Sequence, residues 1–271
     1  MSEKHYKKAL TIAGSDSGGG AGIQADLKSF SANGVYGMSV LTAITAQNTR
    51  GVQGIHPVPP DMISQQIRSV MEDIGADAVK TGMLHSSAVI NTISGALKDY
   101  EPAHLVVDPV MVATSGDKLL EDEAIETMIG VMLPMASLIT PNLPEAEIIL
   151  GRKIETYDQA KEAAKDLAQT GAGAILLKGG HARGEQVIDL LYLPERDELV
   201  EMPYQRIRTG NTHGTGCTLA SAIAAWLARG LDVKQATQKG LDYTHQAISE
   251  GSNYHLGNGH GPVHHFYQYW K

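Results

Sequence analysis

Short apolar runs alternate with amphipathic helical stretches along this chain, and that alternation is what most constrains its fold. Several runs are continuous stretches of Val, Ile and Leu, the composition of strands that are covered on both faces. The expected strands are Ala9–Ala13, Met38–Ala46, Ala78–Thr81, Leu105–Asp108, Ser137–Thr140 and Ala174–Lys178. Strands separated by helices predict an α/β fold, with a mostly parallel central sheet flanked by helices.

Between these strands, apolar residues recur at the i, i+3, i+4 spacing of one helix face. Such stripes lie between Ile63 and Ile74, between Ile125 and Met132, and between Ala160 and Ala168. A fourth runs from Val233 to Ile248, with Asp232 as its expected N-cap. Near the end, Val187–Tyr192 and Glu198–Met202 flank a polar turn and predict an antiparallel hairpin. We expect one domain over residues 1–271, because no linker or repeat interrupts the pattern.

Composition excludes several classes of protein. With 42% hydrophobic and 19% charged residues the chain is expected to be globular, and its net charge of -8 argues against a nucleic-acid partner. Cys217 is the only cysteine, so a disulfide-free protein of a reducing compartment is expected. The longest apolar stretch, Leu219–Ala228, is about half a membrane span. We therefore expect a cytoplasmic protein without a membrane anchor.

Glycine and polar residues follow the expected strands directly. In a parallel sheet the carboxyl ends of the strands share one edge, and ligands bind just outside it. Six segments scattered along the chain are therefore predicted to converge on one site: Gly14–Gly22, Gln47, Gly82–Met83, Asp108–Pro109, Asn142–Glu145 and Gly179–His181.

The first glycine-rich run, Gly14–Gly22, lies between a strand and a helix. Its glycines would let backbone amides approach a ligand, although a tight turn between strand and helix would need glycines too. No acidic residue occurs between Asp26 and Asp61, so the ribose-binding carboxylate of a dinucleotide site is missing. A phosphate-binding P-loop is excluded as well, because the chain contains no Gly-Lys pair.

The second glycine-rich run, Thr212–Thr218, leads directly into an apolar helix. Gly214, Thr215 and Gly216 are expected to form an anion hole, because unpaired amides and the positive end of the helix dipole face the same point. The same field predicts a lowered pKa for the Cys217 thiol. The alternative is that Cys217 is a small buried residue, as most free cysteines are.

Further polar residues at strand ends have two interpretations each. Asn142 and Glu145 could hold hydrated Mg²⁺ and a phosphate, or simply begin a helix. Asp108 could belong to a metal or phosphate region or to a turn before proline, and Lys178 could neutralise a phosphate or lie on the surface. For the histidine-rich tail we favour a packed or solvated segment over metal ligation; its histidines are His255, His260, His264 and His265.

These residues carry a family resemblance that extends over nearly the whole chain. The motifs run from Ala9-Leu-Thr-Ile-Ala-Gly-Ser-Asp through Gln24-Ala-Asp-Leu-Lys, Ala46-Gln-Asn-Thr-Arg-Gly-Val, Lys80-Thr-Gly-Met-Leu and Val107-Asp-Pro-Val-Met-Val to Thr140-Pro-Asn-Leu-Pro-Glu-Ala-Glu, Lys178-Gly-Gly-His, His213-Gly-Thr-Gly-Cys-Thr and Gly259-His-Gly-Pro-Val-His-His-Phe-Tyr. The chain resembles the hydroxymethylpyrimidine/phosphomethylpyrimidine kinases of thiamine biosynthesis, within the ribokinase-like superfamily. One departure is Gly18, where the family usually has serine, which puts a hydroxyl contact of this loop in doubt.

The resemblance implies a three-layer ribokinase-like sandwich, ATP and Mg²⁺ as cofactors, and a homodimer. It places Gly214, Thr215 and Gly216 at the transferring phosphate, and Cys217 where most of the superfamily has a catalytic aspartate. Asp108 and Glu145 would lie near Mg²⁺, and Asn142 and Lys178 would bind the nucleotide together with Gly214 and Gly216. The implied pyrimidine pocket consists of Gly14, Asp26, Gln47, Met83 and Val110. A lid is expected at Thr114–Lys118.

The closest alternative is a pyridoxal or pyridoxine kinase of the same superfamily, alone or as a second activity. Gln47 favours the pyrimidine, because a side-chain amide matches an amino group beside a ring nitrogen. A non-catalytic nucleotide-binding protein would be expected to have lost Cys217, Glu145 or a glycine of the anion hole, and all are present. The motifs leave open whether one or both phosphorylations occur.

Overall fold

The expected alternation of strands and helices is present in the computed structural model, which describes residues 4–111, 120, 122–179 and 185–270. One sheet lies at the centre, in the order β10-β9-β8-β7-β6-β5-β1-β2. Its first six strands along the chain are parallel, and β9 and β10 form the expected antiparallel hairpin. Their bounds are β1 (Lys8–Ala13), β2 (Tyr36–Leu41), β5 (Ala78–Thr81), β6 (Leu105–Val107), β7 (Leu138–Ile139), β8 (Ile175–Leu177), β9 (Gln186–Leu193) and β10 (Glu198–Gln205).

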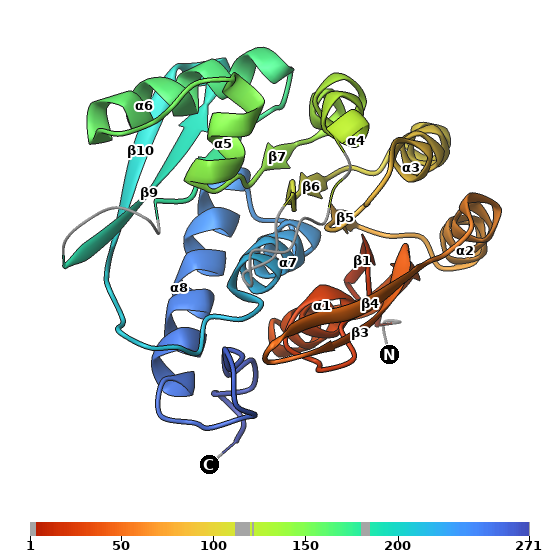
Figure 1. Ribbon diagram of the computed structural model, residues 1–271. Coiled ribbons are helices and arrows are strands. Elements are labelled where there is room, and N and C mark those ends of the chain that lie inside the picture. Colours follow the sequence, from red (N-terminus) through yellow and green to blue (C-terminus); the bar gives the residue numbers. More distant parts are fainter. Residues whose placement is uncertain (1–3, 112–119, 121, 180–184, 271) are drawn as a thin grey trace.

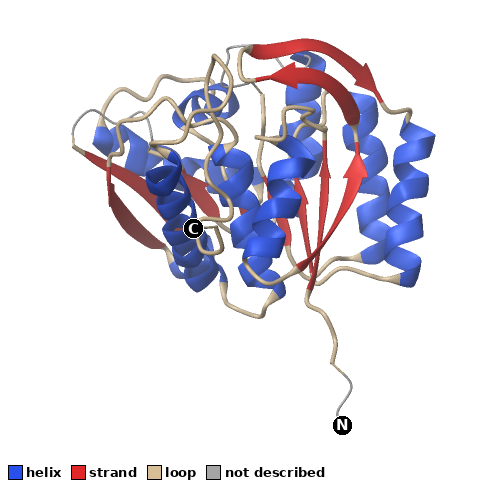
Figure 2. Cartoon of the chain, turned by 90° about the horizontal axis from the view of Figure 1, so that it is seen from below, coloured by secondary structure: helices blue, strands red, loops and turns tan. Residues whose placement is uncertain are grey.

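Helices cover both faces of this sheet, as Figures 1 and 2 show. One face carries α2 (Pro60–Asp73), α3 (Ser87–Tyr100), α4 (Asp122–Thr127), α5 (Leu143–Leu150) and α6 (Tyr157–Asp166). The other face carries α1 (Gly22–Ala32), α7 (Thr215–Ala228) and α8 (Val233–Gly251). Short 3₁₀ or π turns occur at Met128–Met132, Leu133–Met135, Leu167–Thr170 and Pro194–Arg196. The predicted three-layer sandwich is confirmed.

The alternation of side chains along each strand divides the core in two. In β1, Leu10 and Ile12 point to the layer of α2 and α3, where Ile63 and Ile90 are fully buried. Ala9 points the other way, toward Phe30 of α1 and the apolar side chains of α7. Because both faces are covered, the strands need apolar residues at nearly every position, which explains the continuous runs in the sequence.

The expected strand Met38–Ala46 is wrong, because the chain leaves the central sheet at Thr42. This residue is buried, and its hydroxyl donates to the Met83 carbonyl at 2.7 Å. Beyond it, β3 (Ala43–Asn48) pairs with β4 (Gly51–Pro57), a strand that the sequence pattern missed, in a separate two-stranded sheet. Most of β4 is exposed, so it has no apolar pattern to detect. We call residues 43–57 the flap; Figure 2 shows it arching over the carboxyl ends of the central strands.

The packing of α7 against α8 depends on a glycine. A Cβ atom added to Gly240 of α8 would lie 2.5 Å from Cγ1 and 3.1 Å from the backbone nitrogen of Ile223 in α7. Gly95 in α3 is also within a helix, but a Cβ atom there would meet no atom within 4 Å. Alanine substitutions at these two glycines therefore distinguish the effect of close packing from that of intrinsic helix propensity.

We predict that Gly240→Ala lowers the free energy of unfolding by about 1–3 kcal/mol, because overpacking outweighs the better helix propensity of alanine. Gly95→Ala should instead raise it by up to about 1 kcal/mol, the usual gain from glycine to alanine in a helix. Urea unfolding of the three proteins measures both values. A stabilised Gly240→Ala variant would contradict the close approach of α7 and α8.

Candidate active site

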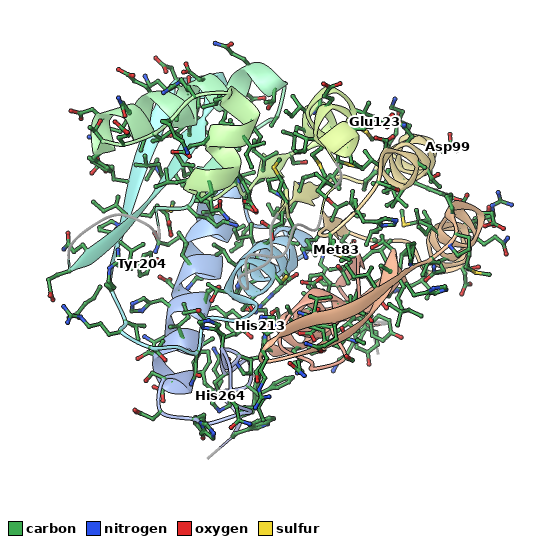
Figure 3. All side chains as sticks on the ribbon, in the orientation of Figure 1. Met83, Asp99, Glu123, Tyr204, His213 and His264 are labelled. Atoms are coloured by element: carbon green, nitrogen blue, oxygen red, sulfur yellow. The ribbon has the colours of Figure 1, made fainter. Side chains whose placement is uncertain are left out.

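A cavity of about 560 Å³ lies at the carboxyl ends of the strands. Segments that follow β1, β5, β6, β7 and β8 meet there, together with the flap and the start of α7, as the strand order predicts. Figure 3 labels three side chains of its wall, Met83, His213 and Tyr204. Every predicted site residue except Asp26 lines it: Gly14, Gln47, Met83, Asp108, Val110, Asn142, Glu145, Lys178, Gly214, Thr215, Gly216 and Cys217.

The first turn of α7 faces this cavity. Gly214 is the N-cap, with φ at 78°, and a Cβ atom there would lie 1.8 Å from the Gly20 carbonyl oxygen. Only glycine fits this position, because the two glycine-rich loops touch here. The cap makes no side-chain hydrogen bond, so the first-turn amides of Gly216 and Cys217 are not taken by a cap. This is the geometry of an anion hole.

The first glycine-rich loop folds around a carboxylate. Asp16 accepts hydrogen bonds from the amides of Gly18 at 2.8 Å, Gly20 at 3.0 Å and Ala21 at 2.8 Å. Its Oδ2 also lies 2.8 Å from Nε2 of His213. Burial would raise the pKa of Asp16, but His213 and the amides hold it below its usual value. These amides bind Asp16 within the turn and are not available to a ligand. For them, the interpretation as a tight turn between strand and helix is the better one.

The prediction that Asp26 contacts a substrate is corrected, because its side chain is fully buried behind the cavity wall. Its carboxylate is bonded to Nζ of Lys80 at 3.0 and 2.9 Å and accepts the hydroxyls of Thr11 and Ser221. Burial would lower the pKa of Lys80, but the carboxylates of Asp26 and Asp108 raise it overall, so the ammonium stays charged. Lys80 borders the cavity instead.

Lys80 is thus a site residue that the sequence reasoning did not single out. The sequence feature that could have identified it is a lysine within the expected strand Ala-Val-Lys-Thr. All four residues of this strand are buried, and a buried charge needs a partner. His213 was also missed as a site residue, although it precedes the predicted anion hole. Each of the two is paired with a buried aspartate, Lys80 with Asp26 and His213 with Asp16, and a sequence alone does not show these pairings.

The predicted low pKa of the Cys217 thiol is wrong for the protein without ligands. Burial raises the pKa of Cys217 to about 11. The Lys80 ammonium opposes this shift, whereas the carboxylates of Asp26 and Asp108 add to it. The helix dipole favours a thiolate, but desolvation of the charged form is the larger effect here. At neutral pH the sulfur therefore keeps its proton.

The acidic residues lie beside Lys178. Its Nζ is 3.0 Å from Oδ1 of Asp108, which also accepts the Thr140 hydroxyl at 2.9 Å. Burial would raise the pKa of Asp108, but Lys178 and Lys80 lower it overall, so this carboxyl is ionised. A Cβ atom on Gly216 would be 3.5 Å from both Asp108 Oδ2 and Lys178 Nζ. The ion pair thus lies directly next to the anion hole.

Asn142 and Glu145 form a capping box, so the helix-start interpretation holds for this pair. Each side chain accepts the backbone amide of the other residue, at 2.9 Å in both directions. Burial nonetheless raises the pKa of Glu145 to about 7, with the charge of Asp108 adding to the effect of burial and that of Lys178 opposing it. Glu145 lines the cavity, so it can serve as a cap and still face a ligand.

Gln47 reaches the cavity from the flap and not from the central sheet. Its side-chain Oε1 lies 3.1 Å from the Thr45 hydroxyl, a donor to that oxygen. The Ser17 hydroxyl both donates to the Gln47 carbonyl and accepts its amide, at 2.9 Å each. The loop therefore contacts the flap through the Ser17 hydroxyl. Gly18 packs tightly here, since a Cβ atom would lie 3.2 Å from Asn48 Cα.

The cavity continues between the late hairpin and α8, along a wall that the sequence reasoning missed. Tyr204 is held there by hydrogen bonds with Asp242 at 2.9 Å and with Gln238. Asp189 accepts the Gly179 amide at 2.7 Å, and burial raises its pKa to about 6. The wall is mostly apolar and can accept a flat ring next to Lys178; it includes Val187, Tyr204, Leu241, Thr244 and Ile248.

The histidine-rich tail is exposed in its first part, which includes His255 and His260, and packs against the protein in its second part. His264 and His265 are buried, and Nε2 of His265 lies 3.0 Å from the Thr218 hydroxyl. Within the described part of the chain, no group of three His, Cys, Asp or Glu residues could hold a metal ion. The same residues contain no helix that is long and apolar enough to cross a membrane. The expected lid, Thr114–Lys118, lies outside the described residues.

Comparison with known proteins places these features in context. The phosphomethylpyrimidine kinase family model matches residues 16–264. A hydroxymethylpyrimidine/phosphomethylpyrimidine kinase of Rhizobium meliloti is 51% identical, over 97% of this chain and 98% of its own length. The crystal structure of phosphomethylpyrimidine kinase from Clostridium difficile is 47% identical with a TM-score of 0.79, covering 89% of this chain and 99% of that one. An ADP complex of Bacillus subtilis pyridoxal kinase is 38% identical with a TM-score of 0.88, covering 96% and 98%.

The raised pKa of Cys217 predicts slow alkylation. At pH 8 only about one thiol in a thousand would be ionised, and the thiolate is the reactive form. The labelling rate with iodoacetamide should rise about tenfold per pH unit up to at least pH 10. Because Cys217 is the only cysteine, mass spectrometry of the intact protein measures this rate directly, with the urea-unfolded chain as control. A plateau below pH 9 would instead show a lowered pKa.

Proposed function

The chain belongs to the phosphomethylpyrimidine kinase family, and from this premise we propose that it transfers the γ-phosphoryl group of ATP to 4-amino-5-hydroxymethyl-2-methylpyrimidine and then to its monophosphate, as in thiamine biosynthesis. One observation carries the proposal. Gly216 and Cys217, whose amides are not bonded by a cap side chain, line the same cavity as Gln47 of the flap and as the Lys178–Asp108 pair. A phosphoryl group held at these amides would face an acceptor on one side and a nucleotide on the other. Both ligands in this proposal, ATP and the pyrimidine, are small molecules. The homodimer remains a prediction.

Phosphoryl transfer needs a positioned alcohol and stabilised charge on the equatorial oxygens. The amides at the start of α7, with the ammonium groups of Lys80 and Lys178, supply fixed positive charge around this point. Cys217 keeps its proton in the free protein, so it is poorly suited to be the resting base. In a loose transition state the alcohol loses its proton late. We therefore assign Cys217 to orienting the alcohol.

The acidic residues fit a magnesium nucleotide. Mg²⁺ is usually held by one or two carboxylates together with substrate phosphates, and does not require a complete protein cage. Asp108 and Glu145 are two buried carboxyls at the cavity, close enough for the charge of one to raise the pKa of the other. They would hold the ion, which would neutralise phosphate charge. Lys178 would stay paired with Asp108 and face the same phosphates.

Gln47 supports the pyrimidine as acceptor. Its amide can pair with an amino group and the adjacent ring nitrogen, and Met83 and Val110 line the same cavity as apolar walls. The alternative is pyridoxal phosphorylation, which the likeness to the Bacillus subtilis pyridoxal kinase keeps open as a second activity. One amide does not exclude a similar flat ring completely.

A coupled ADP-release assay tests both substrates. We predict turnover with the hydroxymethylpyrimidine and with its monophosphate, and at least a tenfold lower kcat/KM with pyridoxal. Gln47→Ala should raise the KM for the pyrimidine at least about tenfold, the usual cost of a lost specific hydrogen-bonding pair, and leave the KM for ATP nearly unchanged.

Gln53→Ala is the matched control, because Gln53 is an exposed flap residue that bonds only within the hairpin turn. This variant should behave like the wild type. A preference for pyridoxal in the wild type would overturn the proposed substrate. Equal rises of both KM values in Gln47→Ala would overturn the assignment of the pocket.

The pKa of Glu145 predicts a pH dependence of magnesium binding. A carboxyl with a pKa of about 7 is mostly protonated at pH 6 and ionised at pH 8, and the metal must displace the proton. Apparent Mg²⁺ affinity in the nucleotide complex should therefore be about tenfold weaker at pH 6 than at pH 8.

Glu145→Gln provides the comparison, because glutamine at this position preserves the capping box. The variant should bind Mg²⁺ more weakly at pH 8 and lose most of the pH dependence. Titration of ATP itself affects both proteins alike, so the difference between them reports on Glu145. The same pH ratio in wild type and variant would remove Glu145 from the metal site.

A further inference from the structure

The C-terminal segment 257–262, Gly-Asn-Gly-His-Gly-Pro, crosses the cavity side of the molecule; we call it the strap. We propose that the strap is a positioning element. It holds the flap, and with it Gln47, in the position where the Gln47 side chain can contact the acceptor ring. This inference rests on the proposed function, because it assigns the strap a part in substrate selection. Figure 1 shows this dark blue segment beside the tip of the β3–β4 hairpin.

The strap is bonded to the flap tip. Thr49 lies in the turn between β3 and β4, two residues after Gln47. Its carbonyl accepts the His260 amide at 2.8 Å, and its hydroxyl accepts the Gly259 amide at 3.2 Å. A Cβ atom on Gly259 would lie 1.9 Å from the Thr49 carbonyl oxygen, and one on Gly257 would lie 2.3 Å from its hydroxyl. The strap approaches the flap so closely that side chains at these two positions would push it away.

The other end of the strap contacts the segment that leads into the anion hole. The His213 amide donates to the Gly261 carbonyl at 3.0 Å, and His213 pairs with Pro262 as an isolated parallel bridge. A Cβ atom on Gly20 would lie 2.5 Å from the His213 ring and 3.1 Å from Pro262. One short segment therefore touches the flap, the approach to α7 and the first glycine-rich loop.

Both ends of the strap are anchored in the core. Before it, the Asn211 side chain donates to the carbonyls of Gly251 and Tyr254, at 2.8 and 2.7 Å. After it, Val263 and His264 are buried, and the His264 amide donates to the Ala247 carbonyl of α8 at 2.9 Å. The strap thus connects α8 to the flap through these hydrogen bonds.

The flap needs such support. A two-stranded hairpin is marginally stable on its own, and residues 53–57 of β4 are exposed. Its other hydrogen bonds to the first glycine-rich loop lie near its base and at the cavity. The Ser15 amide donates to the Ala43 carbonyl at 2.9 Å, the Thr45 hydroxyl donates to the Ser15 carbonyl at 2.7 Å, and Ser17 is bonded to Gln47. Small errors in the position of a binding group cost much of its effect. A displaced flap tip would move Gln47. It would leave in place the apolar wall between the late hairpin and α8, which contains Val187 and Tyr204 and is proposed to bind the nucleotide.

The test compares Gly259→Ala with Asn258→Ala, an adjacent exposed position in the strap. For Gly259→Ala we expect a KM for the pyrimidine at least tenfold higher, a KM for ATP within twofold of wild type, and faster amide hydrogen exchange in residues 45–53. Asn258→Ala should match the wild type in all three. Unchanged exchange in β1 and β5 shows that the fold is intact.

A second variant weakens the contact without adding atoms to the strap. Thr49→Ala removes the hydroxyl that accepts the Gly259 amide, whereas the Thr49 carbonyl still accepts the His260 amide. It should raise the KM for the pyrimidine less than Gly259→Ala does, and again leave the KM for ATP within twofold of wild type.

The proposal is overturned if Gly259→Ala leaves both the pyrimidine KM and flap exchange as in wild type, or raises the two KM values equally. If the wild type phosphorylates no pyrimidine, the proposed function fails instead, and hydrogen exchange still decides whether the strap holds the flap: faster exchange in Gly259→Ala supports that contact, and unchanged exchange rejects it.

Discussion

The buried pair of Lys80 and Asp26 is the interaction on which the site depends. It joins β5 to α1, and the hydroxyls of Thr11 and Ser221 extend it to β1 and α7. Removing one partner would leave an uncompensated buried charge, which typically costs about 3–5 kcal/mol. Four elements that carry the cavity are thereby held in one arrangement. Within this pair, Lys80 also lines the candidate site.

Much of the fold was predictable because it follows from burial. Strands covered on both faces need apolar residues throughout, so most of the central parallel strands could be located in the sequence. The flap could not, since its second strand is exposed and the run from Met38 to Ala46 hides a change of sheet at Thr42. A break of this kind depends on hydrogen bonds to distant segments, here to Ala13 and Met83, which leave no local pattern.

The candidate site could likewise be predicted only in part from the sequence. Residues that follow the central strands were predicted to meet and they line one cavity, because the parallel topology brings these strand ends to one edge; Gln47 reaches the cavity from the flap instead. Their charges were harder to predict: the pKa of Cys217 was expected to be lowered, and desolvation raises it. Asp26 was assigned to the substrate, although it binds Lys80 instead. Both errors concern burial and pairing across many residues of sequence, which a motif does not encode.

The raised pKa of Cys217 has a consequence beyond phosphoryl transfer. Peroxides oxidise thiolates and react poorly with protonated thiols. A kinase with its only sulfhydryl in the candidate active site would be expected to be vulnerable to oxidative stress. The raised pKa lowers that vulnerability, since a sulfur that keeps its proton at neutral pH reacts slowly with peroxides. Cys217 also has no second cysteine with which to form an intramolecular bridge.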